Sequence, residues 1–377
     1  MTSKRGKKEG SFCFLDTSDE YRLSTFERLT LTGGGELERA IRWLSSQFGK
    51  LPVGDPTIDF NRKLFEQSYQ FYTSQRWMNS PEDFFVSPTE APTVSERCLH
   101  KLADGEVVDL EYASQYRVQF RPYASTFKKF KENGRVHVRL WRHRERARCT
   151  VVAIHGWTMG DQRLNSLAFL PGMFYNRGLD VALIELPFHG RRKPKVSVAG
   201  ELLFPSANIA RTNESMGQVI SDLRQLHLYL KESGTNDIGL VGMSLGAYIA
   251  ALWCSLGFLD FCIPVVPLVS LAEVAWDVLH EFDRFSLFER AGISLEVLEQ
   301  VYHIHSPLAH HPKISPRRVL ILAGLGDSIV PPGQPKLLWQ HWGMPTLYWM
   351  RGGHVAQLQR SRGYKEIVAF LGRLGYL

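Results

Sequence analysis

Six short, uninterrupted apolar runs constrain the fold of this chain more than any other feature of its sequence. Between them lie segments with helical spacing of apolar residues, for example at 216–229 and 365–374. A strand covered by helices on both faces needs a continuous apolar run rather than an alternating one. The pattern therefore predicts an α/β fold with a mostly parallel central sheet and helices on both faces. The six runs are 150–154, 181–184, 238–241, 263–269, 319–323 and 347–350.

The residues before these runs have a different character. Residues 1–35 are polar and end in three glycines, which is typical of a flexible leader. Residues 36–93 are expected to form an N-terminal helical extension, with apolar spacing of three and four at 36–48 and an aromatic-rich stretch at 60–77. The main α/β domain is expected at 94–377, beginning with antiparallel strands where apolar and polar residues alternate, at 107–112 and 136–141.

Charge and cysteine content exclude several classes of protein. The net charge is +7, but the basic residues are spread over short runs, and no helix-turn-helix, zinc-finger or RNA-binding signature accompanies them. We therefore expect no nucleic-acid partner. The five cysteines form no C-x-x-C pair, so neither a metal site nor a disulfide framework is expected, and no cofactor motif is present.

Targeting signals are also missing from the sequence. The basic N-terminus lacks the apolar stretch of a signal peptide, and no run of about 18 apolar residues suits a transmembrane helix. We expect a cytoplasmic protein, and contact with a membrane surface stays open.

The segment Gly242-Met243-Ser244-Leu245-Gly246 stands between a predicted strand and a predicted helix. The turn must be very sharp if it is to push the serine hydroxyl out of the sheet, and Gly242 and Gly246 remove side chains that would collide there. The N-terminus of the following helix would favour a developing anion. Ser244 is therefore the predicted nucleophile, although the pentapeptide alone also fits an ordinary glycine-rich turn.

A serine needs a base, and the base needs an orienting acid. Asp327 follows the run at 319–323, and His354 follows the run at 347–350. Both therefore belong to the edge of a parallel sheet where ligand-site residues gather. Asp327 also suits a plain turn, and Glu273 is a rival acid after the preceding run. We prefer Asp327 and His354, in the order Ser, Asp, His.

The oxyanion hole is expected to use two backbone N–H groups. One belongs to Leu245, directly after the nucleophile, and the other to Trp157 in the loop after the first apolar run. His155 begins the same loop, and we interpret it as a structural histidine rather than the base.

This ordered set of motifs resembles the α/β-hydrolase superfamily over about residues 150–377. Three stretches are similar to the branch of α/β-hydrolase domain-containing protein eighteen and its bacterial relatives: Leu186 to Pro194, the elbow with Val265 to Ser270, and Gly352 to Val355. In that branch a tyrosine often stands at His189 and a second glycine at Ala247. The resemblance implies ester or lipid hydrolysis.

Two further features bear on the substrate. Residues 271–318 carry two helical, aromatic-bearing segments and are expected to form a cap over the pocket. Arg191 and Arg192 follow a strand, so they are candidates for contacts with an anionic substrate. The predicted function is carboxylic ester hydrolysis of a small-molecule or lipid ester. A peptidase, a thioesterase and a non-catalytic binding protein on the same scaffold stay as alternatives.

Overall fold

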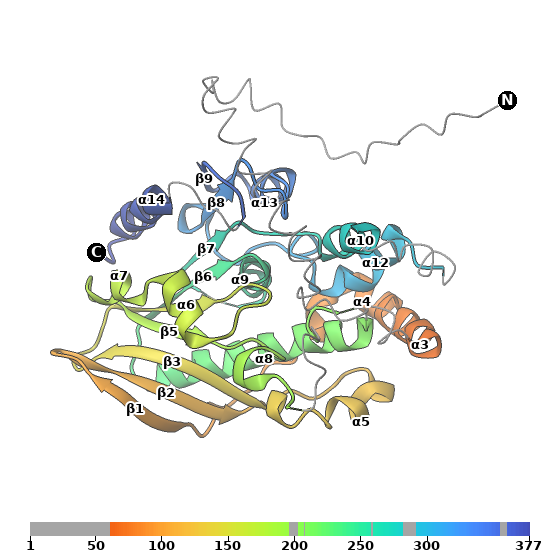
Figure 1. The fold of residues 1–377 in the computed structure, drawn as a ribbon, viewed down its shortest axis with the longest axis horizontal. Coiled ribbons are helices and arrows are strands. Elements are labelled where there is room, and N and C mark those ends of the chain that lie inside the picture. Colours follow the sequence, from red (N-terminus) through yellow and green to blue (C-terminus); the bar gives the residue numbers. More distant parts are fainter. Residues whose placement is uncertain (1–60, 196–202, 207, 258, 282–291, 355–359) are drawn as a thin grey trace, which may run out of the picture.

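The computed structural model describes residues 61–195, 203–206, 208–257, 259–281, 292–354 and 360–377, and these form a central sheet with helices on both of its faces (Figure 1). The predicted leader at 1–35 and the helix predicted at 36–48 lie outside the described residues. Within the described residues, nine strands are ordered β1-β2-β3-β5-β4-β6-β7-β8-β9 across the sheet. The strands are β1 (Ser95–Lys101), β2 (Gly105–Ala113), β3 (Arg135–His143), β4 (Cys149–Ile154), β5 (Asp180–Ile184), β6 (Asp237–Met243), β7 (Phe261–Val265), β8 (Leu320–Gly324) and β9 (Thr346–Met350).

The six apolar runs became the parallel part of the sheet, from β5 to β9, as predicted. Along β4, Val152 and Ile154 face one helical layer while Val151 and Ala153 face the other, and all four are buried. Two buried faces explain the absence of alternation in the sequence. The run predicted at 263–269 ends as a strand at Val265, because Val266 adopts a φ of 43°.

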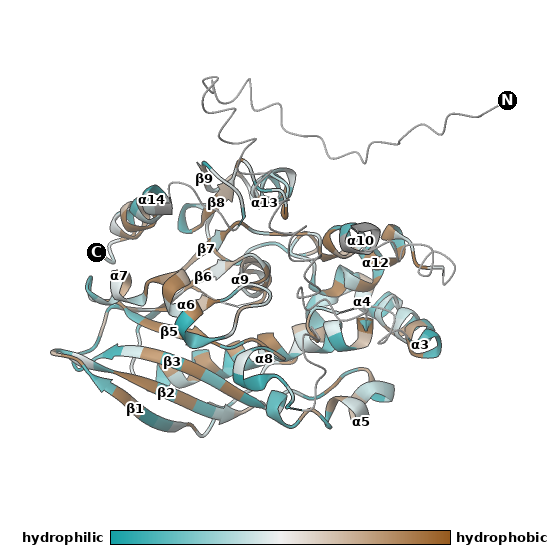
Figure 2. Ribbon diagram, in the orientation of Figure 1, coloured by the Kyte–Doolittle hydropathy of each residue, from teal (hydrophilic) through white to brown (hydrophobic). Residues whose placement is uncertain are grey.

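The helices divide between the two faces. The first face carries α8 (Ile209–Glu232), α9 (Leu245–Leu256) and α13 (Gly333–His341). The opposite face carries α6 (Gln162–Phe169), α7 (Pro171–Tyr175) and α14 (Arg360–Arg373). Figure 2 shows apolar residues concentrated on the central strands and on the helices that pack against them.

The antiparallel part of the sheet extends it beyond β5. β3 pairs antiparallel with β5 and with β2, and β2 pairs antiparallel with β1. Val108, Leu110 and Val138 join the same apolar cluster as α8. The opposite face holds charged side chains, among them Asp109 and Arg139, which form an ion pair with a 2.8 Å contact.

The aromatic stretch predicted as one helix at 60–77 is two helices, α3 (Arg62–Tyr72) and α4 (Gln75–Asn79). The break falls at Thr73 and Ser74. The Thr73 hydroxyl donates to the Tyr69 carbonyl, and Ser74 is extended with ψ 149°, so the helix stops and restarts. The α3 helix lies beside α12 (Leu295–Tyr302), and the Tyr69 hydroxyl donates to Gln300 at 2.6 Å (Figure 1).

Among the described residues of the predicted cap segment are the helices α10 (Leu271–Glu281) and α12, followed by the short helix η5 (His303–His305). A buried polar chain joins η5 to the helix after Ser244. The Tyr248 hydroxyl lies 2.6 Å from His305 Nδ1, and His305 Nε2 lies 3.0 Å from Asn213 Oδ1 on α8. The segment is therefore anchored to the sheet-covering helices.

Candidate active site

Ser244 stands alone between the last residue of β6 and the first residue of α9. Its φ is 55° and its ψ is −117°, a combination that residues other than glycine rarely adopt. Its backbone N–H donates to the Val265 carbonyl at 2.9 Å, which fixes the reversal. The strain is local to the residue whose hydroxyl must leave the sheet, and such strain often marks a functional position.

Glycines on both sides of Ser244 permit this turn. A Cβ atom on Gly242 would lie 2.2 Å from the Gly246 carbonyl oxygen, and one on Gly246 would lie 1.9 Å from the Ile154 carbonyl oxygen. Both distances are far inside van der Waals contact, and the opposing atoms are backbone. The helix α9 can therefore approach β6 and β4 only with glycine at these two positions.

The His354 ring lies between the serine and an aspartate. Its Nε2 is 2.8 Å from Ser244 Oγ, and its Nδ1 is 2.7 Å from Asp327 Oδ2. Because a carboxylate can only accept, Nδ1 carries the proton and Nε2 is left to accept from the serine hydroxyl. The three predicted residues come from the ends of three strands, and their side chains form one continuous hydrogen-bonded chain.

The aspartate is held rigidly in its loop. Its Oδ1 accepts from the backbone N–H groups of Ile329 at 3.0 Å and Val330 at 2.7 Å, which leaves Oδ2 for the histidine. The loops that follow β8 and β9 are also bonded together, since the Gly326 N–H donates to the Gly352 carbonyl at 2.9 Å. The Asp327 side chain is only 2% exposed, so its bond to His354 is shielded from solvent.

The rival residues have other contacts. The Glu273 carboxylate accepts from Gln334 Nε2 at 3.0 Å, and burial raises the pKa of this carboxyl. His155 donates from Nδ1 to the Gly156 carbonyl at 2.8 Å, while its Nε2 accepts from the Leu186 N–H at 3.0 Å. Burial lowers the pKa of His155 to about 3, so the ring stays neutral. These contacts match the structural role expected for His155.

The loop that carries Trp157 borders the elbow. A Cβ atom on Gly156 would lie 3.4 Å from Ser244 Cβ and 3.3 Å from the Met243 carbonyl oxygen, so the loop backbone passes directly beside the serine. Leu245 is the first residue of α9, where backbone N–H groups have no partner within the helix. Both predicted oxyanion donors therefore belong to segments that adjoin Ser244.

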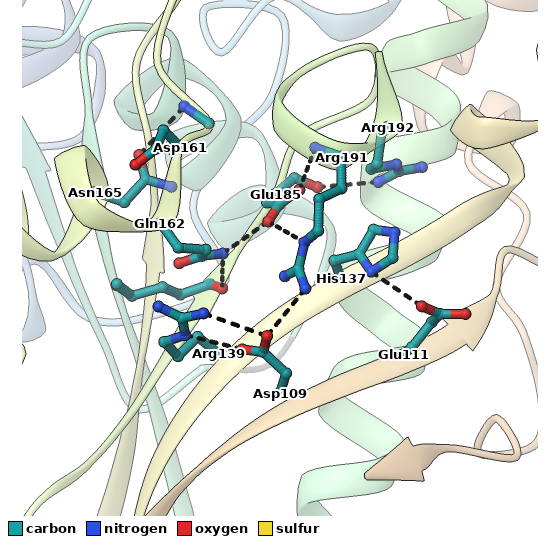
Figure 3. Close-up of polar contacts among 12 residues, drawn as sticks. Asp109, Glu111, His137, Arg139, Asp161, Gln162, Asn165, Glu185, Arg191 and Arg192 are labelled. Carbon is teal, nitrogen blue, oxygen red and sulfur yellow. Dashed lines mark hydrogen bonds and ion pairs between the residues drawn. The ribbon is translucent and has the colours of Figure 1, made fainter. Parts of the chain in front are cut away.

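The two arginines are placed differently from the expectation. Arg192 is fully buried, and its guanidinium donates to Asp222 at 2.8 Å and to the carbonyls of Glu185 and Asn133. A fully buried and paired guanidinium is inaccessible to a substrate, so the anion-binding role suggested for Arg192 is wrong. Arg191 pairs with Glu185 at 2.8 Å and with Asp109 at 3.0 Å (Figure 3). Its side chain is 37% exposed, but its charge is already matched by two carboxylates.

Sequence reasoning missed Glu185, which begins the turn after β5. The signal was available, because a carboxylate directly after an apolar run must either reach a ligand site or find a partner. Glu185 is buried, and burial raises the pKa of its carboxyl while Arg191 opposes that change. Its contacts connect the loops after β4 and β5 (Figure 3).

In the part of the chain that the structure describes, no cluster of three or more His, Cys, Asp or Glu side chains is arranged to hold a metal ion. Among the helices of those same residues, none combines the length and apolar character that crossing a bilayer requires.

The strand order, the helices on both faces and the elbow are those of the α/β-hydrolase fold, and the chain is similar to proteins of that superfamily. Residues 115–277 match the family model described as alpha/beta hydrolase domain containing 18. The matched segment includes Ser244 and the turn from Glu185 to Arg192, and it ends before Asp327 and His354.

Relatives and solved structures are similar over most of the chain. The uncharacterized protein Rv2627c of Mycobacterium tuberculosis is 28% identical over 382 aligned residues, covering 89% of this chain and 87% of that protein. An acetyl xylan esterase from Paenibacillus sp. R4 has a TM-score of 0.55 and 13% identity, covering 78% of this chain and 98% of that one. At this identity the second likeness concerns the fold alone.

Proposed function

We propose that this protein is a serine hydrolase that cleaves carboxylic esters through an acyl-enzyme on Ser244, with His354 as base and Asp327 as orienting acid. The observation that carries the proposal is the position of His354, hydrogen-bonded on one side to the Ser244 hydroxyl and on the other to Asp327. A serine, a neutral imidazole and a carboxylate in this order are what acyl transfer requires.

In the first half-reaction, Ser244 Oγ attacks the ester carbonyl carbon while His354 Nε2 takes the hydroxyl proton. The carbonyl oxygen becomes an oxyanion, which the N–H groups of Trp157 and Leu245 stabilise. The C–O bond of the ester then breaks, and the proton on His354 passes to the leaving alkoxide. The hydrogen bond from His354 Nδ1 to Asp327 holds the imidazole in the required tautomer and stabilises the imidazolium.

In the second half-reaction, a water molecule takes the place of the alcohol. His354 removes its proton as the water oxygen attacks the acyl carbonyl, and the same two N–H groups hold the second oxyanion. Collapse of this intermediate breaks the bond to Ser244 Oγ, which recovers its proton from His354. The carboxylic acid product leaves, and the enzyme returns to its starting state.

The helices α10 and α12 are proposed to form a cap over the acyl site. In support, α10 begins at Leu271, six residues after β7 ends, and the last residue of β7, Val265, accepts a hydrogen bond from the Ser244 N–H. Its Glu273 contacts Gln334, which also bonds to the backbone N–H of Val269. A cap in this place would exclude water and shape the acyl pocket.

The test is Ser244→Ala. We expect this variant to lose turnover of short p-nitrophenyl esters and labelling by a fluorophosphonate probe, because it lacks the hydroxyl that lies 2.8 Å from His354 Nε2. The matched control is Ser255→Ala, which alters a serine of the same helix α9 whose hydroxyl donates to the Ala251 carbonyl. Undiminished labelling of the Ser244→Ala protein would contradict the assignment.

Substrate class is tested on the same preparation. Acyl-enzyme chemistry also serves thioesterases and peptidases, so matched oxygen esters, thioesters and amides of one acyl group should be compared by kcat/KM. We expect the oxygen ester to be the best substrate. Preference for the amide would favour a peptidase, and a folded wild type inert toward all three would favour a binding protein.

A further inference from the structure

The turn after β5 holds the loop after β4 at both of its ends. At the first end, the Leu186 N–H donates to His155 Nε2 at 3.0 Å, and His155 Nδ1 donates to the Gly156 carbonyl at 2.8 Å. These two bonds fix the tautomer and the orientation of a fully buried ring. The start of the loop that passes beside Ser244 is therefore tied to the residue after Glu185.

At the second end, the carboxylate of Glu185 makes the connection. Its Oε1 accepts from Gln162 Nε2 at 3.2 Å and from Arg191 Nε at 2.8 Å, while its Oε2 accepts from the Arg191 backbone N–H at 2.8 Å (Figure 3). Gln162 is the first residue of α6, so it directly follows the loop. One buried side chain thus holds the end of the loop and also closes its own turn.

Between these two ends the loops are in backbone contact. A Cβ atom on Gly160 would lie 2.6 Å from the Gly190 nitrogen. One on Gly190 would lie 2.5 Å from the Gly160 carbonyl oxygen and 2.7 Å from Glu185 Oε2. Both glycines have positive φ, 122° and 52°, so the contact depends on backbone conformations that other residues rarely adopt.

The turn itself is anchored on the antiparallel strands. Arg191 Nη1 donates to Asp109 Oδ2 at 3.0 Å, and Asp109 also accepts from Arg139 Nε at 2.8 Å. The charge of Glu185 is thereby matched by a guanidinium that is itself held by Asp109 of β2, and Arg139 of β3 holds the same carboxylate. These contacts fix the position of the loop after β4 relative to the sheet.

We propose that Glu185 is a positioning residue for the oxyanion hole. It holds Gln162 at the end of the loop after β4 and closes the Gly190 turn that contacts this loop, and so sets where the loop places the Trp157 N–H beside Ser244. This inference rests on the proposed function. An oxyanion donor stabilises the transition state only when it is within a few tenths of an ångström of its place, and a misplacement of about 1 Å costs roughly 100-fold in rate.

The experiment uses the full-length Glu185→Gln protein, which keeps the shape of the side chain but removes its charge and turns one acceptor into a donor. We expect kcat for a p-nitrophenyl ester to fall by about 10- to 100-fold with KM changed less than threefold, because the oxyanion exists only in the transition state. The Ki of a trifluoromethyl ketone, which forms an oxyanion on Ser244, should rise by a similar factor.

A buried carboxylate elsewhere provides the matched control. Glu214 on α8 is buried and accepts from Tyr72, Tyr116 and two backbone N–H groups, and none of these belongs to the loop after β4. Glu214→Gln should lower the urea midpoint while leaving kcat and Ki within twofold. If Glu185→Gln does not fold, Gln162→Met removes the contact to the loop without changing any charge, and a smaller loss of kcat is expected.

The outcomes separate this inference from the proposed function. A folded Glu185→Gln or Gln162→Met protein with unchanged kcat overturns the positioning role while ester hydrolysis stands. A loss of kcat with no change in the Ki of the ketone also overturns it, because the oxyanion contacts would then be intact. If the wild type neither hydrolyses esters nor reacts with the fluorophosphonate, the proposed function is contradicted, and this inference is contradicted with it.

Discussion

At the scale of single residues, the acid that partners His354 is decided by geometry rather than by residue type. Asp327 and Glu273 are both carboxylates that follow apolar runs, and both come after Ser244 in the sequence. Asp327 Oδ2 lies 2.7 Å from His354 Nδ1, whereas the Glu273 carboxylate accepts a hydrogen bond from Gln334. The pair therefore offers a direct comparison between a carboxylate that orients the ring and one that does not.

We expect Asp327→Asn to lower kcat by about 1,000- to 10,000-fold, because an amide no longer stabilises the imidazolium and favours the wrong tautomer. Glu273→Gln, which changes the rival acid in the same way, should alter kcat less than fivefold. Steady-state kinetics on one p-nitrophenyl ester measures both. Equal losses in the two variants would contradict the assignment of Asp327.

At the scale of elements, the approach of α9 to the sheet rests on glycine at 246. The Cβ that alanine adds there would meet the carbonyls of Ile154 and His155 at 1.9 and 2.6 Å, and backbone cannot move aside easily. Glycine is otherwise a poor helix residue, so its use in the first turn of α9 is a packing requirement. Gly372 in α14 is the opposite case, because nothing lies within 4 Å of an added Cβ.

Gly246→Ala and Gly372→Ala should therefore move stability in opposite directions. The first should destabilise the protein by about 2–4 kcal/mol through overpacking, or prevent folding. The second should stabilise it by roughly 0.5–1 kcal/mol, because alanine restricts the unfolded chain and favours the helix. Urea unfolding followed by circular dichroism measures both changes, and a destabilised Gly372→Ala protein would refute the comparison.

At the scale of the whole molecule, several histidines are buried in the neutral form. Burial lowers the pKa of His155 and His305 to about 3, and that of His137 and His189 to about 4. In the unfolded chain the same rings titrate near pH 6.5. The unfolded state therefore binds more protons below that pH, and the stability contributed by these rings is complete above it and is lost on acidification.

We expect the urea midpoint to fall between pH 7 and pH 4.5. His305 isolates the effect, because glutamine can accept from Tyr248 and donate to Asn213 without titrating. His305→Gln should reduce the slope of the unfolding free energy against pH by up to about 1.4 kcal/mol per pH unit below pH 6.5.

The control for this prediction is His311→Gln, since His311 is exposed in the folded protein. Buried carboxyls such as Glu214 and Asp222, whose pKa values burial raises, act in the opposite direction at acid pH. The comparison of slopes between variants is unaffected by that background. Identical slopes in the wild type and His305→Gln would show that this ring does not contribute.

The sequence by itself determined the elements that local composition specifies. Runs of apolar residues fixed the parallel strands, because burial on both faces leaves no alternative composition. Glycine spacing around Ser244 indicated the sharp turn, and the later Asp327 and His354 indicated the ends of two further strands. Each of these features depends on residues that are close together in the sequence.

Only the tertiary structure decided what long-range pairing controls. The helix α8 begins at Ile209, although the pattern indicated a start near 216, because Glu214 and its neighbours are polar residues satisfied by distant partners such as Tyr72 and Phe120. Likewise, the sequence indicated that Arg191 and Arg192 were available to bind an anion. In the folded chain Arg191 pairs with Glu185 and Asp109, and Arg192 pairs with Asp222. Burial of a charged group depends on partners far away in the sequence, and no local pattern specifies them.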